Sequence, residues 1–89
     1  MQFTWDPAKA EQNLLAHDVS FQEATTVFGD PLAGTIPDPD HSVGEERYTT
    51  VGHSSAGQLL VVCHIEQGDT IRIISARRAT SHERKDYET

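Results

Sequence analysis

The sequence predicts an α+β domain in which two N-terminal helices pack on one face of a mostly antiparallel sheet of four to five strands, followed by a short C-terminal helix. Helical patterns are confined to residues 7–28 and 80–88. Three strand-like segments, joined by short turns with glycine, follow one another between residues 47 and 76. Short hairpins require antiparallel neighbours, and this segregation of helices from strands is typical of the α+β class.

The bulk properties of the chain limit its class. At 89 residues it is expected to be a single domain, residues 1–89, with one core and no large enclosed cofactor pocket. Hydrophobic residues make up 36% and lie in short segments, which argues against disorder. No apolar run approaches the roughly 20 residues that cross a bilayer, and the first residues lack a signal-peptide pattern, so we expect a cytoplasmic protein without membrane contact. The single cysteine, Cys63, excludes an internal disulfide and is expected to be buried in a strand.

The N-terminal segment is expected to contain a short edge strand, residues 2–5, and a helix that runs to about residue 16. Asp6 and Pro7 open this helix, because Asp is a good N-cap and Pro is well tolerated at the first helical position. Asp18 closes it in the left-handed conformation. The side chains expected to face the core are Ala10, Leu14 and Leu15.

A second helix is expected from Ser20, which forms a capping box with Glu23, to the stop signal at Gly29–Pro31. Its core face would hold Phe21, Ala24, Thr25 and Phe28, at the i, i+3, i+4 and i+7 spacing.

The remaining strands follow in order. A strand is expected at residues 32–36, then an acidic loop with two prolines at residues 37–46. Thr80 and Glu83 form a second capping box that opens the terminal helix. The three later strands are residues 47–53, the apolar central strand 59–66 and the isoleucine-rich strand 70–76.

The charge of the chain is strongly asymmetric. Residues 1–71 carry two basic and eleven acidic side chains, or −9, whereas residues 72–89 carry five basic and three acidic, or +2. The sum is the −7 of the whole chain. A positive end on a negative body indicates one local face for a polyanion.

The strand that begins this basic end places arginines on one side. Strict alternation puts Ile71, Ile73 and Ser75 on the core face, and Arg72 with Ile74 on the open face. The two arginines that follow, Arg77 and Arg78, end the strand, so at least one can point the same way. Arginine binds phosphate through two parallel hydrogen bonds and keeps its charge. The alternative is a solvated edge whose arginines form surface ion pairs with Glu46 or Glu66.

Arg47 and the histidines have alternatives of the same kind. Arg47 either pairs with Glu45 or Glu46, or makes a second phosphate contact across the sheet from Arg72. His17 ends the first helix, where the helix dipole favours its protonated form, so it is a candidate proton donor or acceptor or a helix cap.

The other histidines carry weaker signals. His41 lies among acidic residues in a spacing that fits no standard metal loop. His53, His64 and His82 are expected at strand or helix surfaces. No Gly-rich phosphate loop, paired-cysteine zinc signature or His-Glu-x-x-His pattern is present.

An ordered set of short motifs resembles the BrnT family of toxins from type II toxin–antitoxin systems. Each motif is weak alone, but together they span nearly the whole chain. They are residues 3–10, Asn13, His17, residues 19–24, 27–30 and 40–42, Glu46 with Arg47, Gly52, and residues 59–62, 72–77, 79–80, 83–84 and 87–88.

The resemblance implies a RelE-like fold and an endoribonuclease that needs no metal or cofactor and inhibits translation. It also implies a hetero-oligomer with a BrnA-type antitoxin that carries a ribbon-helix-helix domain, and operator DNA bound only through that complex. Family members often end the first helix with Lys-His-Gly, whereas this chain has Ala16-His17-Asp18, so we expect one substrate contact fewer and weaker cleavage.

Metal-free RNA cleavage needs deprotonation of the 2′-hydroxyl, stabilisation of the phosphorane and protonation of the 5′-oxygen. We expect Arg72 and Arg77 to stabilise the phosphorane, with Arg47 as a third cation and His17 as acid or base. The residues expected to bind the RNA backbone are Lys9, Arg78, Arg84 and Lys85.

Two other functions remain open on the sequence. One is a non-catalytic interaction module that binds a partner protein and acts in operator DNA binding as part of a complex. The other is a metal-dependent hydrolase that uses the loop around His41.

Overall fold

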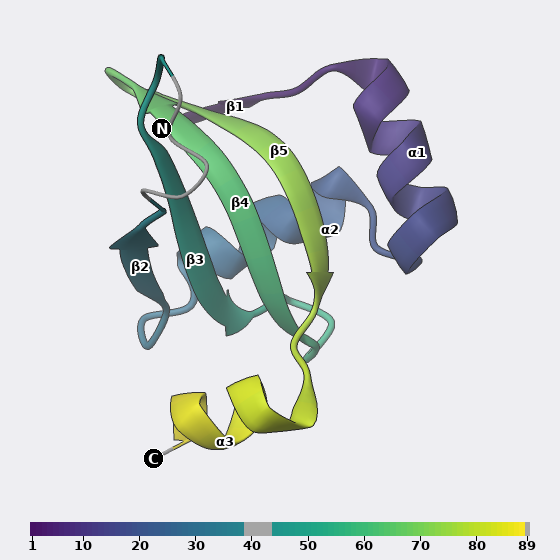
Figure 1. Cartoon of the computed structure of the whole chain (residues 1–89), viewed down its shortest axis with the longest axis vertical. Coiled ribbons are helices and arrows are strands. Elements are labelled where there is room, and N and C mark those ends of the chain that lie inside the picture. Colours follow the sequence, from purple (N-terminus) through teal and green to yellow (C-terminus); the bar gives the residue numbers. More distant parts are fainter. Residues whose placement is uncertain (39–43, 89) are drawn as a thin grey trace.

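The computed structural model of the chain describes residues 1–38 and 44–88. The elements are β1 (Gln2–Thr4), α1 (Pro7–His17), α2 (Phe21–Thr26), the 3₁₀ helix η1 (Val27–Gly29), β2 (Gly34–Pro37), β3 (Arg47–His53), β4 (Leu59–Gln67), β5 (Thr70–Arg78) and α3 (Ser81–Glu88) (Figure 1). The sheet has the order β1-β5-β4-β3-β2, with β1 parallel to β5 and every other pair antiparallel. The α+β prediction is confirmed.

One face of the sheet is covered and the other is open. In Figure 1, α2 and η1 lie behind the sheet, α1 lies beside β5, and α3 follows the end of β5. The core lies between the sheet and α2, and its buried members include Phe21, Val27, Leu60, Val62 and Ile73. We call the uncovered side, on which β3, β4 and β5 are visible in Figure 1, the open face.

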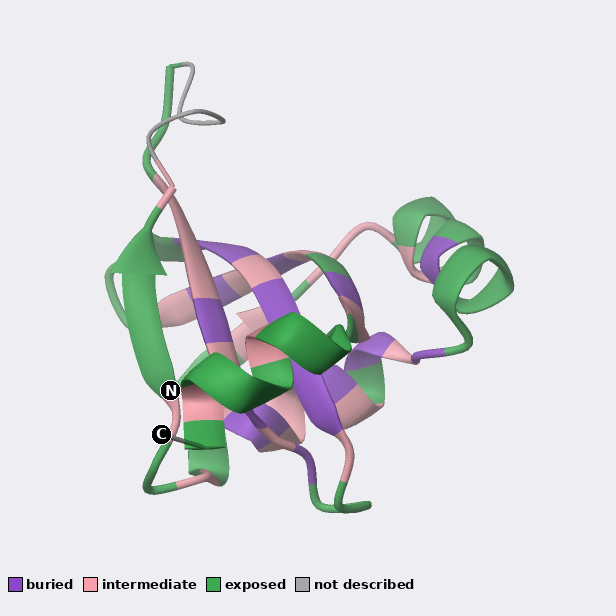
Figure 2. Cartoon of the chain, turned by 60° about the horizontal axis from the view of Figure 1, so that its bottom comes forward, coloured by how far each residue is buried: buried purple, intermediate pink, exposed green. Residues whose placement is uncertain are grey.

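Helix α1 begins and ends as predicted but buries a different residue. The Asp6 side chain accepts a hydrogen bond from the Ala8 amide at 2.8 Å, and Asp18 closes the helix with φ of 55°. Leu14 and Leu15 are 47% and 83% exposed, so the prediction that they face the core is wrong. The helix lies along the edge of the sheet, and its one buried residue is Asn13 (Figure 2).

Asn13 joins α1 to the free edge of β5. Its Nδ2 donates to the carbonyls of Val19 and Ala76 at 2.9 and 2.8 Å, and its Oδ1 accepts from the Ala76 amide at 3.0 Å. Because β1 pairs with β5 only over residues 70–72, the edge groups of Ala76 have no strand partner from β1. The Asn13 side chain supplies the hydrogen bonds that a neighbouring strand would make.

The second helix is shorter than predicted. Ser20 caps it through a 3.0 Å bond from the Glu23 amide, but the Glu23 carboxylate accepts from Ser54 Oγ instead of closing the capping box. The α-helix ends at Thr26, and η1 turns Val27 into the core in the place predicted for Thr25.

Strand β2 starts two residues later than predicted, because Asp30 holds the preceding turn. Its Oδ1 accepts from the Leu32 amide at 2.9 Å, and the Leu32 side chain is 78% exposed. Pro37 ends β2, and an edge strand tolerates the missing N–H.

Strand β5 contains a bulge that the sequence pattern did not indicate. Cys63 pairs with Ser75 and His64 with Ile73, so Ile74 is the extra residue. The bulge reverses the alternation, which turns Ala76 into the core and leaves Ser75 exposed. The prediction that Ser75 shares a face with Ile71 and Ile73 is therefore wrong.

His64 lies in the core and not at the surface, so that prediction is also wrong. Its side chain is 0% exposed, its Nε2 lies 2.7 Å from Thr50 Oγ1, and its ring packs edge-on against Phe28. On a central strand of a two-layer fold, the side opposite the open face points into the core. Burial lowers the pKa of His64 to about 4.

We expect this histidine to weaken the fold as the pH falls from 6.5 towards 4. The unfolded chain binds a proton at His64 near pH 6.5 and the native chain only near pH 4, so the free energy of unfolding decreases over that interval. Urea unfolding at pH 7, 6 and 5 measures this slope. His64→Gln keeps a hydrogen-bonding side chain without the titration, and an unchanged slope in this variant would contradict the assignment.

Candidate functional site

The open face carries three predicted arginines in register. Arg47 of β3 pairs with Ile65 of β4, which pairs with Arg72 of β5, so one row across the sheet has an arginine at each end. A second row ends at Arg77, which pairs with Val61. The rows are four residues apart on β4, or about 13 Å. The structure therefore brings Arg47, Arg72 and Arg77 onto one surface.

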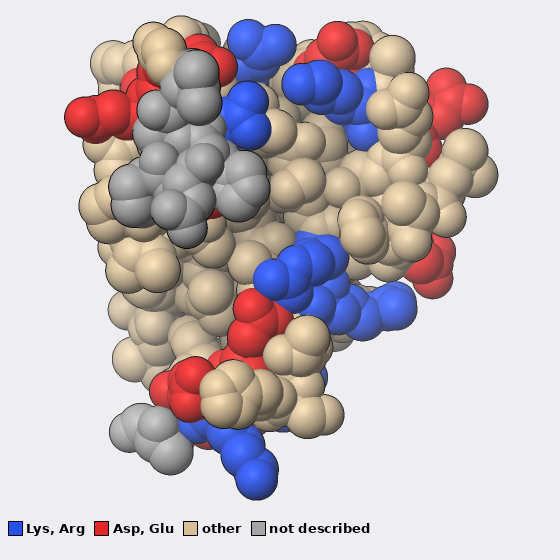
Figure 3. Space-filling model, viewed as in Figure 1, with Lys and Arg blue, Asp and Glu red and all other residues tan. Residues whose placement is uncertain are grey.

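Between the rows the open face forms a hollow of about 430 Å³ with a largely apolar floor. In Figure 3, Lys and Arg side chains lie above and below a central area formed by other residue types. A base can pack on such a floor while cations at its rim hold phosphates. The hollow is lined by Ile36, Asp38, Arg47, Thr49, Val51, Val61, Cys63, Ile74, Ser75, Arg77 and Glu83.

Cys63 belongs to this floor and is only half-buried, whereas the sequence predicted a buried residue. Burial raises the pKa of its thiol, and the nearby charge of Arg47 lowers it by less. The thiolate is the reactive form of cysteine, so Cys63 is not activated as a nucleophile.

Arg77 is held by a carboxylate from α3. Its Nη1 and Nη2 donate to Glu83 Oε1 and Oε2 at 2.8 and 2.9 Å. The paired carboxylate raises the pKa of Arg77, and hydrogen bonds from Arg77 and the Thr80 amide lower the pKa of Glu83 to about 2. Both groups are therefore charged at neutral pH.

The other predicted backbone-binding residues of the basic end do not line the hollow. Arg78 pairs with Leu60, a core-facing position, and donates to Gln58 Oε1 at 2.7 Å. Arg84 lies 3.6 Å from Glu88 along α3, and Lys85 is exposed on the same helix. These side chains contribute charge around the face and not within it.

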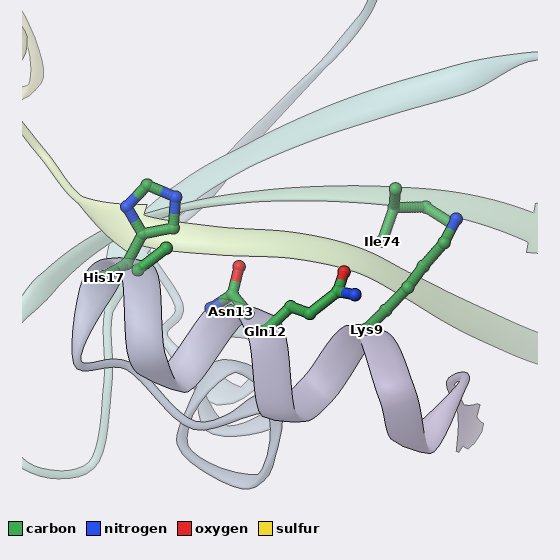
Figure 4. A pocket seen from close by; sticks show the side chains of 6 residues that line it. Lys9, Gln12, Asn13, His17 and Ile74 are labelled. Carbon is green, nitrogen blue, oxygen red and sulfur yellow. The ribbon is translucent and has the colours of Figure 1, made fainter.

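His17 and Lys9 lie on α1 at a second hollow, of about 280 Å³, between this helix and β5. Figure 4 shows both side chains projecting from α1 on the side of β5, with Gln12 and Asn13 between them. Ile74, the bulged residue, lines both hollows. His17 therefore lies beside the arginine-bearing face, at its β5 edge.

The predictions about metals and membranes can be compared with the structure only for the described residues. His41 lies outside them. Among the residues that are described, no group of three or more His, Cys, Asp or Glu side chains is placed to hold a metal ion. None of the described helices has the length and apolar character needed to span a membrane.

One member of the hollow, Glu83, was missed as a site residue. The sequence contains the signal for its position, since the Thr80–Glu83 capping box fixes the first turn of α3. It does not show that this turn brings the carboxylate back to Arg77, six residues earlier.

The fold and the site define a small α+β domain with a local arginine-bearing surface on an acidic body, a class suited to binding a polyanion. The family model described as "Ribonuclease toxin, BrnT, of type II toxin-antitoxin system" matches residues 5–83. The chain belongs to this BrnT family of toxins.

A solved structure agrees in fold. The crystal structure of the Brucella abortus ribonuclease toxin BrnT matches with a TM-score of 0.71 and 20% identity, over 91% of this chain and 99% of that chain. At this identity the likeness concerns the fold alone. No curated protein sequence matches the chain.

Proposed function

We propose that this BrnT-family toxin is a metal-independent endoribonuclease that inhibits translation by cutting RNA. The observation that supports this most directly is the arrangement of Arg47, Arg72 and Arg77 on one sheet face, where Arg47 and Arg77 also line an apolar hollow. The description of the family as a ribonuclease toxin supports the same reaction.

The proposed chemistry distributes three tasks. Arg72 and Arg77, with Arg47 across the sheet, stabilise the phosphorane, because preorganised cations favour the transition state in which charge develops. His17 transfers a proton from its place at the β5 edge. Attack by the 2′-hydroxyl gives a 2′,3′-cyclic phosphate and a 5′-hydroxyl.

The RNA backbone would extend beyond the hollow in two directions. Lys9 lies in the second hollow with His17, and the exposed Lys85 of α3 lies on the other side with Arg84. Arg78 would contribute charge from the end of β5, near Asp18 at 3.6 Å. With Ala16 and Asp18 flanking His17 in place of the Lys and Gly of many family members, cleavage is proposed to be weak.

The partner is proposed to be a BrnA-type antitoxin with a ribbon-helix-helix domain. Membership of a toxin–antitoxin family supports an antitoxin in general. Operator DNA would be bound through the antitoxin in the complex, and the pair would act in the cytoplasm.

The test is cleavage of a labelled single-stranded RNA by the purified chain in EDTA. We expect cleavage, a 2′,3′-cyclic phosphate end, and loss of activity when the product of the adjacent gene is added. Cleavage that occurs without EDTA and disappears with it would contradict the metal-independent reaction. Absence of cleavage both with and without EDTA would contradict ribonuclease activity.

A non-catalytic interaction module is the second candidate. Its support is the net charge of −7 and the pairing of Arg77 with Glu83, which offsets part of the positive charge of the open face. Expression of the chain in cells, scored for growth beside the cleavage assay, separates the two, because growth arrest without any RNA cleavage would favour the module.

A further inference from the structure

Glu83 connects α3 to the proposed site through one carboxylate. Its Oε1 accepts from Arg77 Nη1 at 2.8 Å and from the Thr80 amide at 2.9 Å, and its Oε2 accepts from Arg77 Nη2 at 2.9 Å. The same group therefore closes the N-terminal capping box of α3 and binds both terminal nitrogens of Arg77.

The geometry of this pair leaves one side of Arg77 available. A guanidinium has five N–H donors in a rigid fork. Glu83 takes the end of the fork, and Nη1 also approaches the Arg78 carbonyl at 3.3 Å. Among the described residues none accepts from the Arg77 Nε, so Nε and the second Nη2 hydrogen remain for a phosphate. The two hydrogen bonds from Glu83 to the terminal nitrogens thus orient Arg77 so that its Nε and Nη2 hydrogens can bind a phosphate together.

The far end of α3 is fixed as well, which makes the hold on Arg77 rigid. Tyr87 donates to Asp30 Oδ2 at 2.9 Å, and the Tyr87 ring packs edge-on against His53. Asp30 Oδ2 also accepts from the His53 amide at 2.7 Å, so the anchor joins the residue after η1 to the end of β3. Figure 2, in which the bottom of Figure 1 comes forward, shows α3 in front of the strands.

From this arrangement we infer that Glu83 is a positioning residue for the proposed cleavage, holding Arg77 so that its Nε side meets the reacting phosphate. The inference rests on the proposed function. The inference predicts that removal of the Glu83 carboxylate lowers cleavage. Simple electrostatics predicts the opposite, because a carboxylate at an RNA site repels the substrate.

The test compares Glu83→Ala with two controls on the same helix, using single-turnover and steady-state cleavage of a single-stranded RNA. We expect kcat to fall about tenfold or more in Glu83→Ala, because misorientation of a reacting group has costs of this order. Thr80→Ala removes the 3.2 Å cap bond to the Glu83 amide but keeps the carboxylate on Arg77. Glu88→Ala removes an equal charge elsewhere on α3. Both controls are expected within about twofold of the wild-type kcat, and Glu83→Gln, which keeps one acceptor, between the two levels.

A second readout does not depend on cleavage. The NMR signal of the Arg77 Nε–H is recorded with a 2′-O-methyl RNA, which binds but cannot be cut. We expect a protected signal in the wild type and Thr80→Ala, and its loss in Glu83→Ala. A kcat in Glu83→Ala at or above the wild-type value, or a protected signal in that variant, would overturn the inference. Binding of the methylated RNA by a wild type that cuts no RNA would instead overturn the proposed function, and the NMR comparison would still decide the role of Glu83.

Discussion

Arg72→Ala and Arg77→Ala are each expected to reduce RNA cleavage by about 10²-fold or more without unfolding the chain. The magnitude is that of removing one preorganised donor from a developing negative charge. Neither side chain belongs to the core: both arginines are half-buried at the open face, and the Arg77 side chain is 42% exposed. The measurement is the single-turnover cleavage rate in EDTA, with thermal unfolding as the check on folding.

Two further variants define what the arginines contribute. Arg72→Lys keeps the charge but loses the two-point geometry, so its rate should fall between those of the wild type and Arg72→Ala. Arg84→Ala removes the same charge from the exposed face of α3 and should cause a much smaller loss, mainly in KM. Full growth arrest by both Arg72→Ala and Arg77→Ala would refute the catalytic assignment.

The sequence predicted those features that depend on local signals. The caps at Asp6, Ser20 and Thr80, the left-handed Asp18 and the three later strands are all present. The caps follow from side-chain hydrogen bonds to the backbone within a few residues, and the strands follow from short apolar segments bounded by turn residues. The placement of Arg72 on the open face also followed from alternation, because no irregularity lies between Ile71 and Ile73.

The failures come from contacts between distant segments. The bulge at Ile74 arises between two strands, so a single strand read by itself gives the wrong face for Ser75. Leu14 and Leu15 have the apolar character of core residues, yet α1 lies at the sheet edge and leaves them exposed. The direction of the buried side of α1 is set by Asn13, a polar residue that apolar periodicity overlooks.

The sequence predicted only part of the site, because the rest of it also depends on contacts between distant segments. The pairing of β3, β4 and β5 brings Arg47 and Arg72 to the two ends of one row. Side-chain alternation along each strand predicts that both face the same side once the strands are paired. His64 was misplaced because strand alternation does not say which face is the core. Glu83 was missed because its contact with Arg77 depends on how α3 turns back after β5.

Asn13→Ala is expected to cause the largest loss of stability of any single polar substitution considered for this chain, about 3 kcal/mol. Three hydrogen bonds disappear, and the buried amide and carbonyl of Ala76 are left without their side-chain partner. For a domain of this size the midpoint of thermal unfolding should fall by roughly 15 °C.

The matched control is the neighbouring Gln12→Ala, which changes an exposed residue of the same helix and is expected within about 0.5 kcal/mol of the wild type. Urea unfolding with linear extrapolation measures both variants, and an unchanged m-value shows that the difference is one of stability. A loss below about 1 kcal/mol in Asn13→Ala would mean that water replaces the side chain at Ala76. Because Asn13 also fixes α1 beside β5, and with it His17 beside the arginine-bearing face, the variant should lose cleavage even at temperatures where it remains folded. Stability and the proposed proton transfer thus depend on the same amide, which replaces the strand missing beside the C-terminal part of β5.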